Sequence, residues 1–290
     1  MTEVKNGAAS EQRLSVSKVI DGFLDSPLSG IAPWILLAVI GSPGHYESAI
    51  AIAFGFSIFV LWAGRRRGDR VHSLTAFGVA FFGLLLVIRV LVGANIESWL
   101  STWTGEMSNV ALATFALTTL ALRKPFTMSY AKDMTPEEYW ETPAFVRTNN
   151  VISAAWAAAF TLCAVFGFIG IVFLHDSGNF WTAWILQLGV TFLAAAFTEV
   201  YPDYVGAKLD MEYGQSTGPL PSLLLAVDWI PTYVLVAAVI GWIIDAVPDW
   251  LAITLIVIGI AGSAVTRRIA PVTADESSDM SDSSTGKASG

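Results

Sequence analysis

The stretch that decides the fold class is AFGVAFFGLLLVIRVLV, residues Ala76–Val92, which holds a single ionisable side chain, Arg89. A second run, LAITLIVIGIAGSAV over Leu251–Val265, holds none. A helix needs about 20 mostly apolar residues to cross the hydrocarbon core of a bilayer, and uninterrupted apolar runs are typical of such helices. Both runs therefore predict helices that span a membrane.

The composition of the whole chain supports the same class. Of its 290 residues, 54% are hydrophobic and 14% are charged, whereas soluble domains carry about 25% charged residues. The mean hydropathy is +0.60. The sequence predicts an all-α, polytopic transmembrane helical bundle in the cell membrane, with the lipid bilayer as its main partner.

About eight spans are expected within residues 27–269. The first and the fourth are short for a full crossing, so the first is alternatively one half of a re-entrant hairpin. In chain order the predicted spans are Leu28–Ser42, Ser48–Gly64, Ser73–Gly93, Met107–Leu122, Val151–Leu174, Phe180–Phe197, Leu220–Ile244 and Trp250–Val265.

Lysine and arginine gather in alternate loops. The loops around His45, Ile96, His175 and Val247 contain neither residue, apart from Arg89 within its span. Loops that carry Lys and Arg tend to stay on the cytoplasmic side. Both termini are therefore predicted to be cytoplasmic, with an even number of crossings. The cations on the predicted inner side include Arg65, Arg66, Arg67, Arg123, Lys124, Lys208, Arg267 and Arg268.

The two ends of the chain are predicted to lie outside the bundle. Residues 1–26 are polar and mixed, which argues against a cleavable signal and allows a surface helix over Glu11–Leu24. Residues 270–290 have the composition of a disordered acidic tail. The net charge of −8 favours a halophilic source. Nucleic-acid binding is not expected, because no basic stretch is longer than Arg65–Arg67.

Ionisable groups inside spans are the first candidates for function, because they are costly to bury in lipid. Arg89 lies near the outer end of its span, where it can snorkel to the interface, pair with Glu97 or Glu106, or contact a substrate. Asp228 lies in the seventh span beside a proline, a pattern found in ion pathways. Alternatively, Asp228 is the N-cap of a helix that starts near Ile230.

No clustered catalytic set is present in the sequence. The histidines are far apart, Cys163 is the single cysteine, and the common nucleotide-binding and hydrolase motifs are absent. The sequence therefore predicts neither an enzyme nor a cofactor nor a metal site. A minor hypothesis is a lipid-modifying enzyme that holds a metal with Asp203, Asp210 and Glu212.

The polar loop Arg123–Asn150 carries the remaining candidates. Arg123 and Lys124 are expected to face anionic headgroups, and Pro125 to stop the preceding helix. Thr135 as N-cap predicts a short helix over Pro136–Glu141. Aromatic residues predict a segment along the inner leaflet, with a docking site for a partner as the alternative. These residues are Phe126, Tyr130, Tyr139, Trp140 and Phe145, and Arg147 is expected to neutralise a loop acid or a lipid phosphate.

Residues 28–170 also show a recognisable order of features. A short apolar segment, a second span, a basic loop and two further spans are followed by Arg123-Lys124-Pro125-Phe126, Tyr130, Tyr139-Trp140, Asn149-Asn150 and Trp156. This order resembles the intracellular septation protein A family. The resemblance implies a septation-protein-like part over residues 27–174, followed by additional spans over 175–269. It also implies an inner-membrane protein linked to envelope synthesis and septum formation, without known enzymatic chemistry.

The leading functional prediction is therefore a non-enzymatic interaction or scaffold protein of the cell envelope. Its expected protein partners are other membrane proteins or a second copy of the chain. The alternative prediction is a small-solute or ion transporter in which Arg89 and Asp228 line the pathway.

Overall fold

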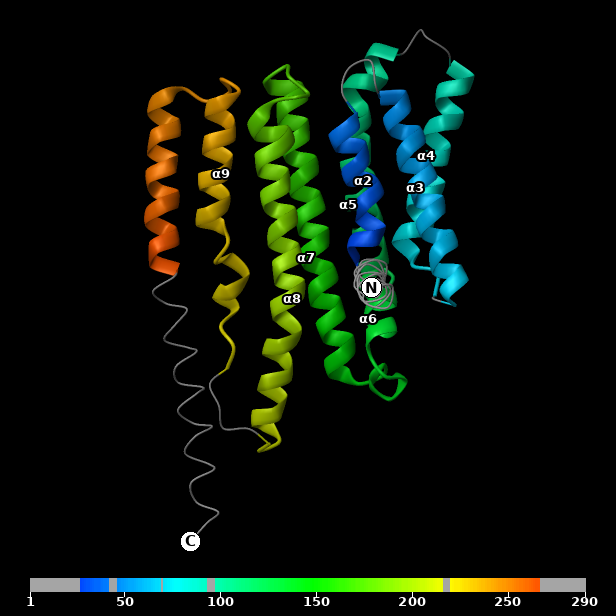
Figure 1. The fold of residues 1–290 in the computed structure, drawn as a ribbon. Helices are drawn as coiled ribbons and strands as arrows, with labels where there is room; N and C mark the ends of the chain where they lie inside the picture. The colour runs from blue at the N-terminus through cyan, green and yellow to red at the C-terminus, as the bar shows by residue number, and fades with distance from the viewer. Residues whose placement is uncertain (1–26, 42–45, 69, 93–96, 216–219, 267–290) are drawn as a thin grey trace, which may run out of the picture. The chain divides into compact units, whose positions relative to one another are not determined.

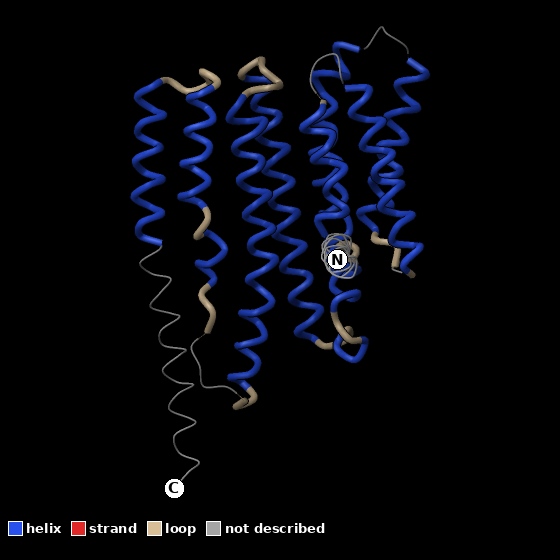
Figure 2. The backbone as a smooth tube through the Cα atoms, in the orientation of Figure 1, coloured by secondary structure: helices blue, strands red, loops and turns tan. Residues whose placement is uncertain are grey.

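The computed structural model describes the chain apart from residues 1–26, 42–45, 69, 93–96, 216–219 and 267–290. The helix expected over Glu11–Leu24 and the tail expected over 270–290 lie outside the described residues. The described part consists of helices and loops and contains no strand (Figure 2), so the all-α prediction is confirmed. The chain divides into two compact units, Met1–Ser177 and Gly178–Gly290.

The first unit is a bundle in which α2, α3 and α4 pack on one another and α5 packs along α7 (Figure 1). A short helix, α6, also packs on α7. The elements of this unit are α2 (Pro27–Ile40), α3 (Tyr46–Arg67), α4 (Ser73–Val92), α5 (Glu97–Ala121), α6 (Thr127–Met134), the 3₁₀ turn η2 (Glu137–Tyr139), α7 (Pro143–Phe168) and the π-helical turn η3 (Ile169–Phe173).

Aromatic side chains join the helices of the first unit. Trp34 of α2 stacks on Phe81 of α4, with ring centroids 4.9 Å apart. Phe77 of α4 stacks on Phe115 of α5 at 4.6 Å, and Phe115 packs at 5.9 Å against Phe126, just before α6. Such pairs contribute about 0.5–1.5 kcal/mol each beyond the area they bury. The aromatic contacts therefore fix the start of α6 against the bundle.

The polar loop differs from the prediction in two ways. It contains the helix α6, which was not assigned, and a 3₁₀ turn at Glu137–Tyr139 in place of a helix over Pro136–Glu141. The helix α7 also begins at Pro143, before the predicted start of the fifth span at Val151. The Thr142 hydroxyl accepts a hydrogen bond from the Phe145 amide, and proline suits the first helical turn, so the polar residues before the span continue its helix.

The second unit contains η4 (Phe180–Ile185), a π-helical turn that leads into α8 (Leu186–Glu212). The 3₁₀ turn η5 (Leu223–Val227) precedes α9 (Ile230–Ile243), and a further helix covers Asp249–Thr266. The Tyr233 hydroxyl of α9 donates a hydrogen bond to the Ile185 carbonyl at 2.6 Å. Gly259 and Gly262 lie against α9 so closely that an added Cβ would overlap Leu235 and Pro231.

Six helices within the described residues are long and apolar enough to cross a membrane. They cover Tyr46–Arg67, Ser73–Leu91, Pro143–Phe173, Phe180–Glu212, Leu223–Ile243 and Asp249–Thr266. Apolar side chains on them face outward, as Val90 and Leu91 do with 81% and 79% of their surface exposed. An apolar outer surface of this kind is typical of a polytopic membrane protein. The predicted crossings by Leu28–Ser42 and Met107–Leu122 stay predictions, although α2 and α5 cover most of these residues.

Candidate functional site

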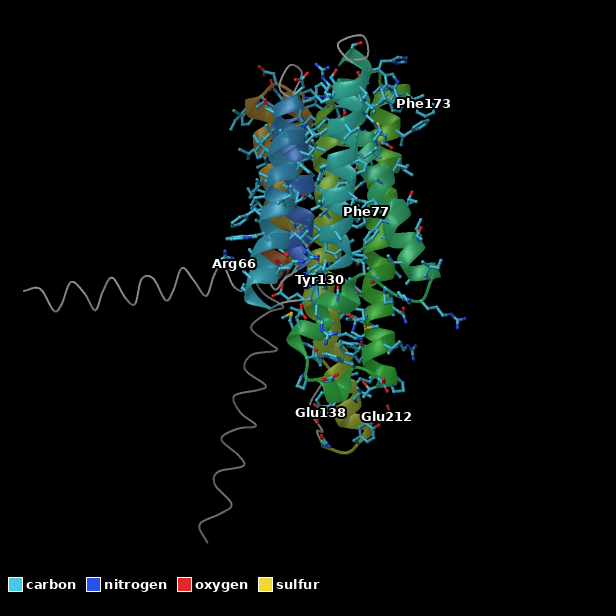
Figure 3. The ribbon with its side chains drawn as sticks, turned by 90° about the vertical axis from the view of Figure 1, so that its right-hand side faces the viewer. Arg66, Phe77, Tyr130, Glu138, Phe173 and Glu212 are labelled. Carbon is cyan, nitrogen blue, oxygen red and sulfur yellow. The ribbon has the colours of Figure 1, made fainter. Side chains whose placement is uncertain are left out.

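A group of polar and aromatic side chains ties the start of α4 to α6 and to the turn that follows α6. We call these six residues the α6 clamp: Arg70, His72, Tyr130, Lys132, Asp133 and Trp140. All of them belong to the first unit. Figure 3 shows Tyr130 towards the same end of this unit as Arg66, whereas Phe173 lies towards the other end.

The centre of the α6 clamp is His72, which precedes α4. Its Nε2 lies 2.8 Å from Asp133 Oδ2, within hydrogen-bond distance, and its ring stacks on the Tyr130 ring with centroids 3.9 Å apart. The side chains of His72 and Asp133 are 8% and 18% exposed, so the contact is partly buried. Arg70 Nε lies 4.0 Å from Asp133 Oδ1 and adds a weaker ion pair.

Two cationic side chains lie over the Trp140 ring. The Arg70 guanidinium lies 4.4 Å from the centre of its ring and the Lys132 ammonium 5.0 Å. The indole N–H of Trp140 donates to the Thr135 carbonyl at 2.9 Å, which fixes the ring orientation. Cation–π contacts of this kind are worth about 0.5–1 kcal/mol at exposed sites. The turn after α6 is therefore held in place as well as α6 itself.

Tyr130 is almost fully buried, with 1% of its surface exposed. Its hydroxyl lies so close to Gly30 of α2 that an added Cβ would overlap it. Burial raises the pKa of Tyr130 above its ordinary value, and the Asp133 carboxylate adds to the rise. Tyr130 is therefore a neutral packing residue that wedges α6 against α2.

Polar groups also tie α6 to α7. The Thr127 hydroxyl lies 2.7 Å from the Ser153 hydroxyl and donates to the Asn149 carbonyl at 3.1 Å. Asn149 in turn donates to the Phe145 carbonyl at 2.9 Å. All these contacts are buried or partly buried, where a satisfied hydrogen bond contributes about 0.5–1.5 kcal/mol. The α6 segment is therefore built into the bundle and is not a loose loop.

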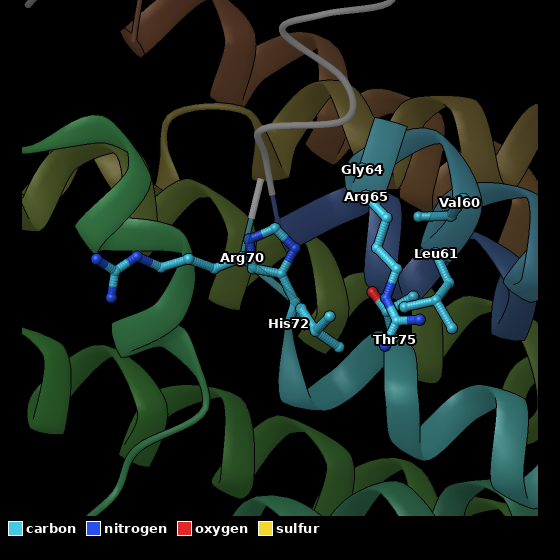
Figure 4. A pocket seen from close by; sticks show the side chains of 8 residues that line it. Val60, Leu61, Gly64, Arg65, Arg70, His72 and Thr75 are labelled. Carbon is cyan, nitrogen blue, oxygen red and sulfur yellow. The ribbon is translucent and has the colours of Figure 1, made fainter. Parts of the chain in front are cut away.

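A small cavity lies beside the α6 clamp, lined by residues that include Arg65, Arg70, His72 and Thr75 (Figure 4). Its volume is about 10 Å³, and a single water needs about 10–15 Å³ by the same measure. Figure 4 shows the Arg70 side chain extending away from Arg65. The cavity is too small for a substrate. The α6 clamp is therefore a structural contact that holds α6 in place, and its outer side is exposed.

The structure separates the candidates in the loop Arg123–Asn150. It brings Tyr130 and Trp140 together in the α6 clamp, while Arg123, Lys124 and Arg147 are exposed. Pro125 is buried. The prediction that Phe126 and Tyr130 lie along the leaflet is wrong, because both rings are only 1% exposed and pack inside the bundle. Tyr139 is 51% exposed and keeps an outward position.

Arg89 forms an ion pair with Glu47 of α3, and its Nε donates to Glu47 Oε1. This partner was not predicted. Of the two partners that were, Glu97 has a side chain outside the described part, and Glu106 lies buried against Gly167 of α7. Arg89 is in the last turn of α4 and the α6 clamp is at its start, so the two sites are separate.

Asp228 lies in the second unit, exposed at the end of η5. The next helix begins at Ile230 as expected, but its N-cap is Trp229, so the N-cap role predicted for Asp228 is wrong. Asp228 instead ends the preceding 3₁₀ turn, which leaves its carboxylate outside the helix start.

Sequence reasoning missed four members of the α6 clamp: Arg70, His72, Lys132 and Asp133. The available signal was a lone histidine next to a basic loop, which has no spacing that identifies a partner. Among the described residues, no group of three or more His, Cys, Asp or Glu side chains is arranged to hold a metal ion. The acids Asp203, Asp210 and Glu212 lie along one exposed helix, α8.

Comparison with protein-family models, with curated proteins and with solved structures finds no match to this chain. The resemblance to the septation family therefore stays a prediction. Together, the fold and the site establish a polytopic helical membrane protein. Between two long helices of its first unit lies a helix–turn segment that is held in place by side-chain contacts.

Proposed function

We propose that this protein acts as a membrane-embedded interaction protein of the cell envelope, and that it docks a partner membrane protein through the turn after α6. We call residues 134–141 the docking turn. The observation that carries the proposal is a contrast between its two sides. The side that faces the bundle is held in place by the α6 clamp, whereas the outward-facing residues Met134 and Tyr139 are 72% and 51% exposed.

This contrast suits recognition for two reasons. A segment held rigid before binding loses less conformational entropy on association than a loose loop does. Aromatic side chains are also over-represented among the residues that dominate binding energy. The proposed orientation, with the cation-rich end in the cytoplasm, is supported by the placement of Lys and Arg in alternate loops.

The docking turn can be tested by photocrosslinking in cells. A photoreactive amino acid replaces Tyr139, and a matched control replaces Leu193, an exposed apolar residue of α8. The proposal expects one or more discrete protein adducts from position 139 and lipid adducts only from position 193. Asp133→Asn should weaken the adduct at 139, because it weakens the contact that holds α6. The absence of any discrete protein adduct from position 139 would contradict the proposal.

A second candidate function, transport of an ion or small solute, is favoured by the break between η5 and α9. Asp228 lies at this break, where backbone groups leave the helical hydrogen-bond pattern. Ion flux into proteoliposomes that contain the wild-type chain, compared with Asp228→Asn, tests this candidate. Transport requires flux in the wild type that the substitution abolishes, and no flux in the wild type rules it out.

A further inference from the structure

A buried carboxyl group, which is not part of the function proposed above, lies between α5 and α7. Glu106 is 6% exposed, and its Oε2 is buried without a hydrogen-bond partner. Asn109, one turn further along α5, donates a hydrogen bond to the Cys163 carbonyl of α7 at 3.5 Å. Oε2 lies so close to Gly167 of α7 that an added Cβ there would overlap it. A glycine at this position is therefore required for the carboxyl group to fit.

The same carboxyl group lines a groove between α5 and α7. The groove has a volume of about 480 Å³, within the range of about 300–1,000 Å³ typical of small-molecule sites. Its other walls are largely apolar and include Val110, Leu117, Val165 and Phe173. One acid at an otherwise apolar groove is complementary to a molecule with one cationic group and an apolar chain.

From these observations we infer that the groove binds a single-chain primary ammonium amphiphile, with its ammonium group on Glu106 and its chain along α5 and α7. A carboxylate can accept about four hydrogen bonds and an ammonium group offers three donors. The contact would be charge-assisted, and it would be made to the part of the Glu106 carboxyl group that lines the groove. The apolar walls would remove the chain from water or lipid headgroups.

The first test uses the wild-type chain in nanodiscs of phosphatidylcholine, a lipid without N–H donors. Dicyclohexylcarbodiimide, an apolar reagent that activates carboxyl groups, is added with decylamine or with decanol. Modification of Glu106 is followed by peptide mass spectrometry and counted as the sum of the N-acylurea and the decyl amide, because the amine can displace dicyclohexylurea from the activated carboxyl group. Decylamine should slow the modification about tenfold relative to decanol, the factor expected for one charge-assisted hydrogen bond. Equal protection by the two compounds would overturn the inference.

The second test asks whether Glu106 itself provides the selectivity. Decylamine should raise the melting temperature of the wild type and of Glu199→Gln, a matched control at an exposed acid of α8, but not that of Glu106→Gln. Ala164→Phe adds a ring to a wall of the groove and leaves the acid unchanged, so it should weaken binding of both probes. A rise in Glu106→Gln equal to that of the wild type would contradict the inference. If that variant does not fold, the labelling experiment on the wild type decides alone. Neither test depends on the docking turn, so failure here leaves the proposed function standing.

Discussion

At the scale of single residues, Arg123 has a strained backbone conformation that the motif Arg123-Lys124-Pro125 does not reveal. It has φ 57°, in the left-handed region that favours glycine. Its amide donates to Leu120 and the Lys124 amide donates to Thr119, which closes the end of α5 with the pair of hydrogen bonds seen where glycine usually ends a helix. The basic motif therefore ends α5 before Pro125 is reached.

Replacement of Arg123 by glycine should stabilise the protein by up to about 1 kcal/mol, because the left-handed conformation costs a side chain about 1–2 kcal/mol and glycine adds a smaller entropy cost. Thermal unfolding in detergent measures the change. Lys124→Gly is the matched control, a neighbouring cation without positive φ among the residues described, and it should not stabilise. A loss of stability in Arg123→Gly would mean that the charge matters more than the strain.

Tyr130 gives a prediction about pH. Burial raises its pKa above the ordinary value of about 10 for tyrosine, so the folded protein holds the phenolic proton more tightly than the unfolded chain does. The resulting stability is complete below about pH 10 and is lost as the pH rises towards the folded pKa. Melting temperatures across this alkaline range should fall less for Tyr130→Phe than for Tyr139→Phe, the exposed control. Equal slopes would show that Tyr130 does not titrate with unfolding.

At the scale of helices, the sequence predicted the spans better than the segments between them. Span boundaries follow from apolar runs, and α4 begins at Ser73 as predicted because the residues before it are polar. The helix α6 was not predictable in the same way. Its side chains are polar on average, and what makes it helical is contact with distant residues, His72 on one side and Ser153 on the other. Tertiary contacts of this kind leave no local pattern.

The pairing of α5 with α7 depends on Gly167. An alanine there would overlap the Glu106 carboxyl group, so Gly167→Ala should destabilise the protein by about 1–3 kcal/mol, the cost of overpacking. Gly105→Ala is the matched control, because an added Cβ at Gly105 meets no atom within 4 Å. It should be neutral or stabilise by about 1 kcal/mol, because alanine favours helices. Urea or thermal unfolding of both variants compares them. An equal effect of the two substitutions would show that Glu106 moves aside without cost.

At the scale of the whole molecule, the composition and the alternation of cations predicted a multi-pass membrane protein, and the six long apolar helices agree with that class. The candidate site was predicted only in part. The aromatic character of Tyr130 and Trp140 makes them candidates, but their roles depend on contacts with Arg70, His72 and Asp133. The sequence alone does not show that these residues meet in the fold. The sequence offers Glu106 as a partner for Arg89, and spacing alone does not reveal its position against Gly167.

The most direct test of this account is the side of the membrane on which each end of the first unit lies. Cys163 is replaced by alanine, and single cysteines are introduced by Glu138→Cys in the docking turn or Ser177→Cys after η3, both at exposed positions. A membrane-impermeant maleimide is then added to intact cells. The account predicts that Ser177→Cys is labelled in intact cells and Glu138→Cys only after permeabilisation. Labelling of both positions from the same side would contradict it.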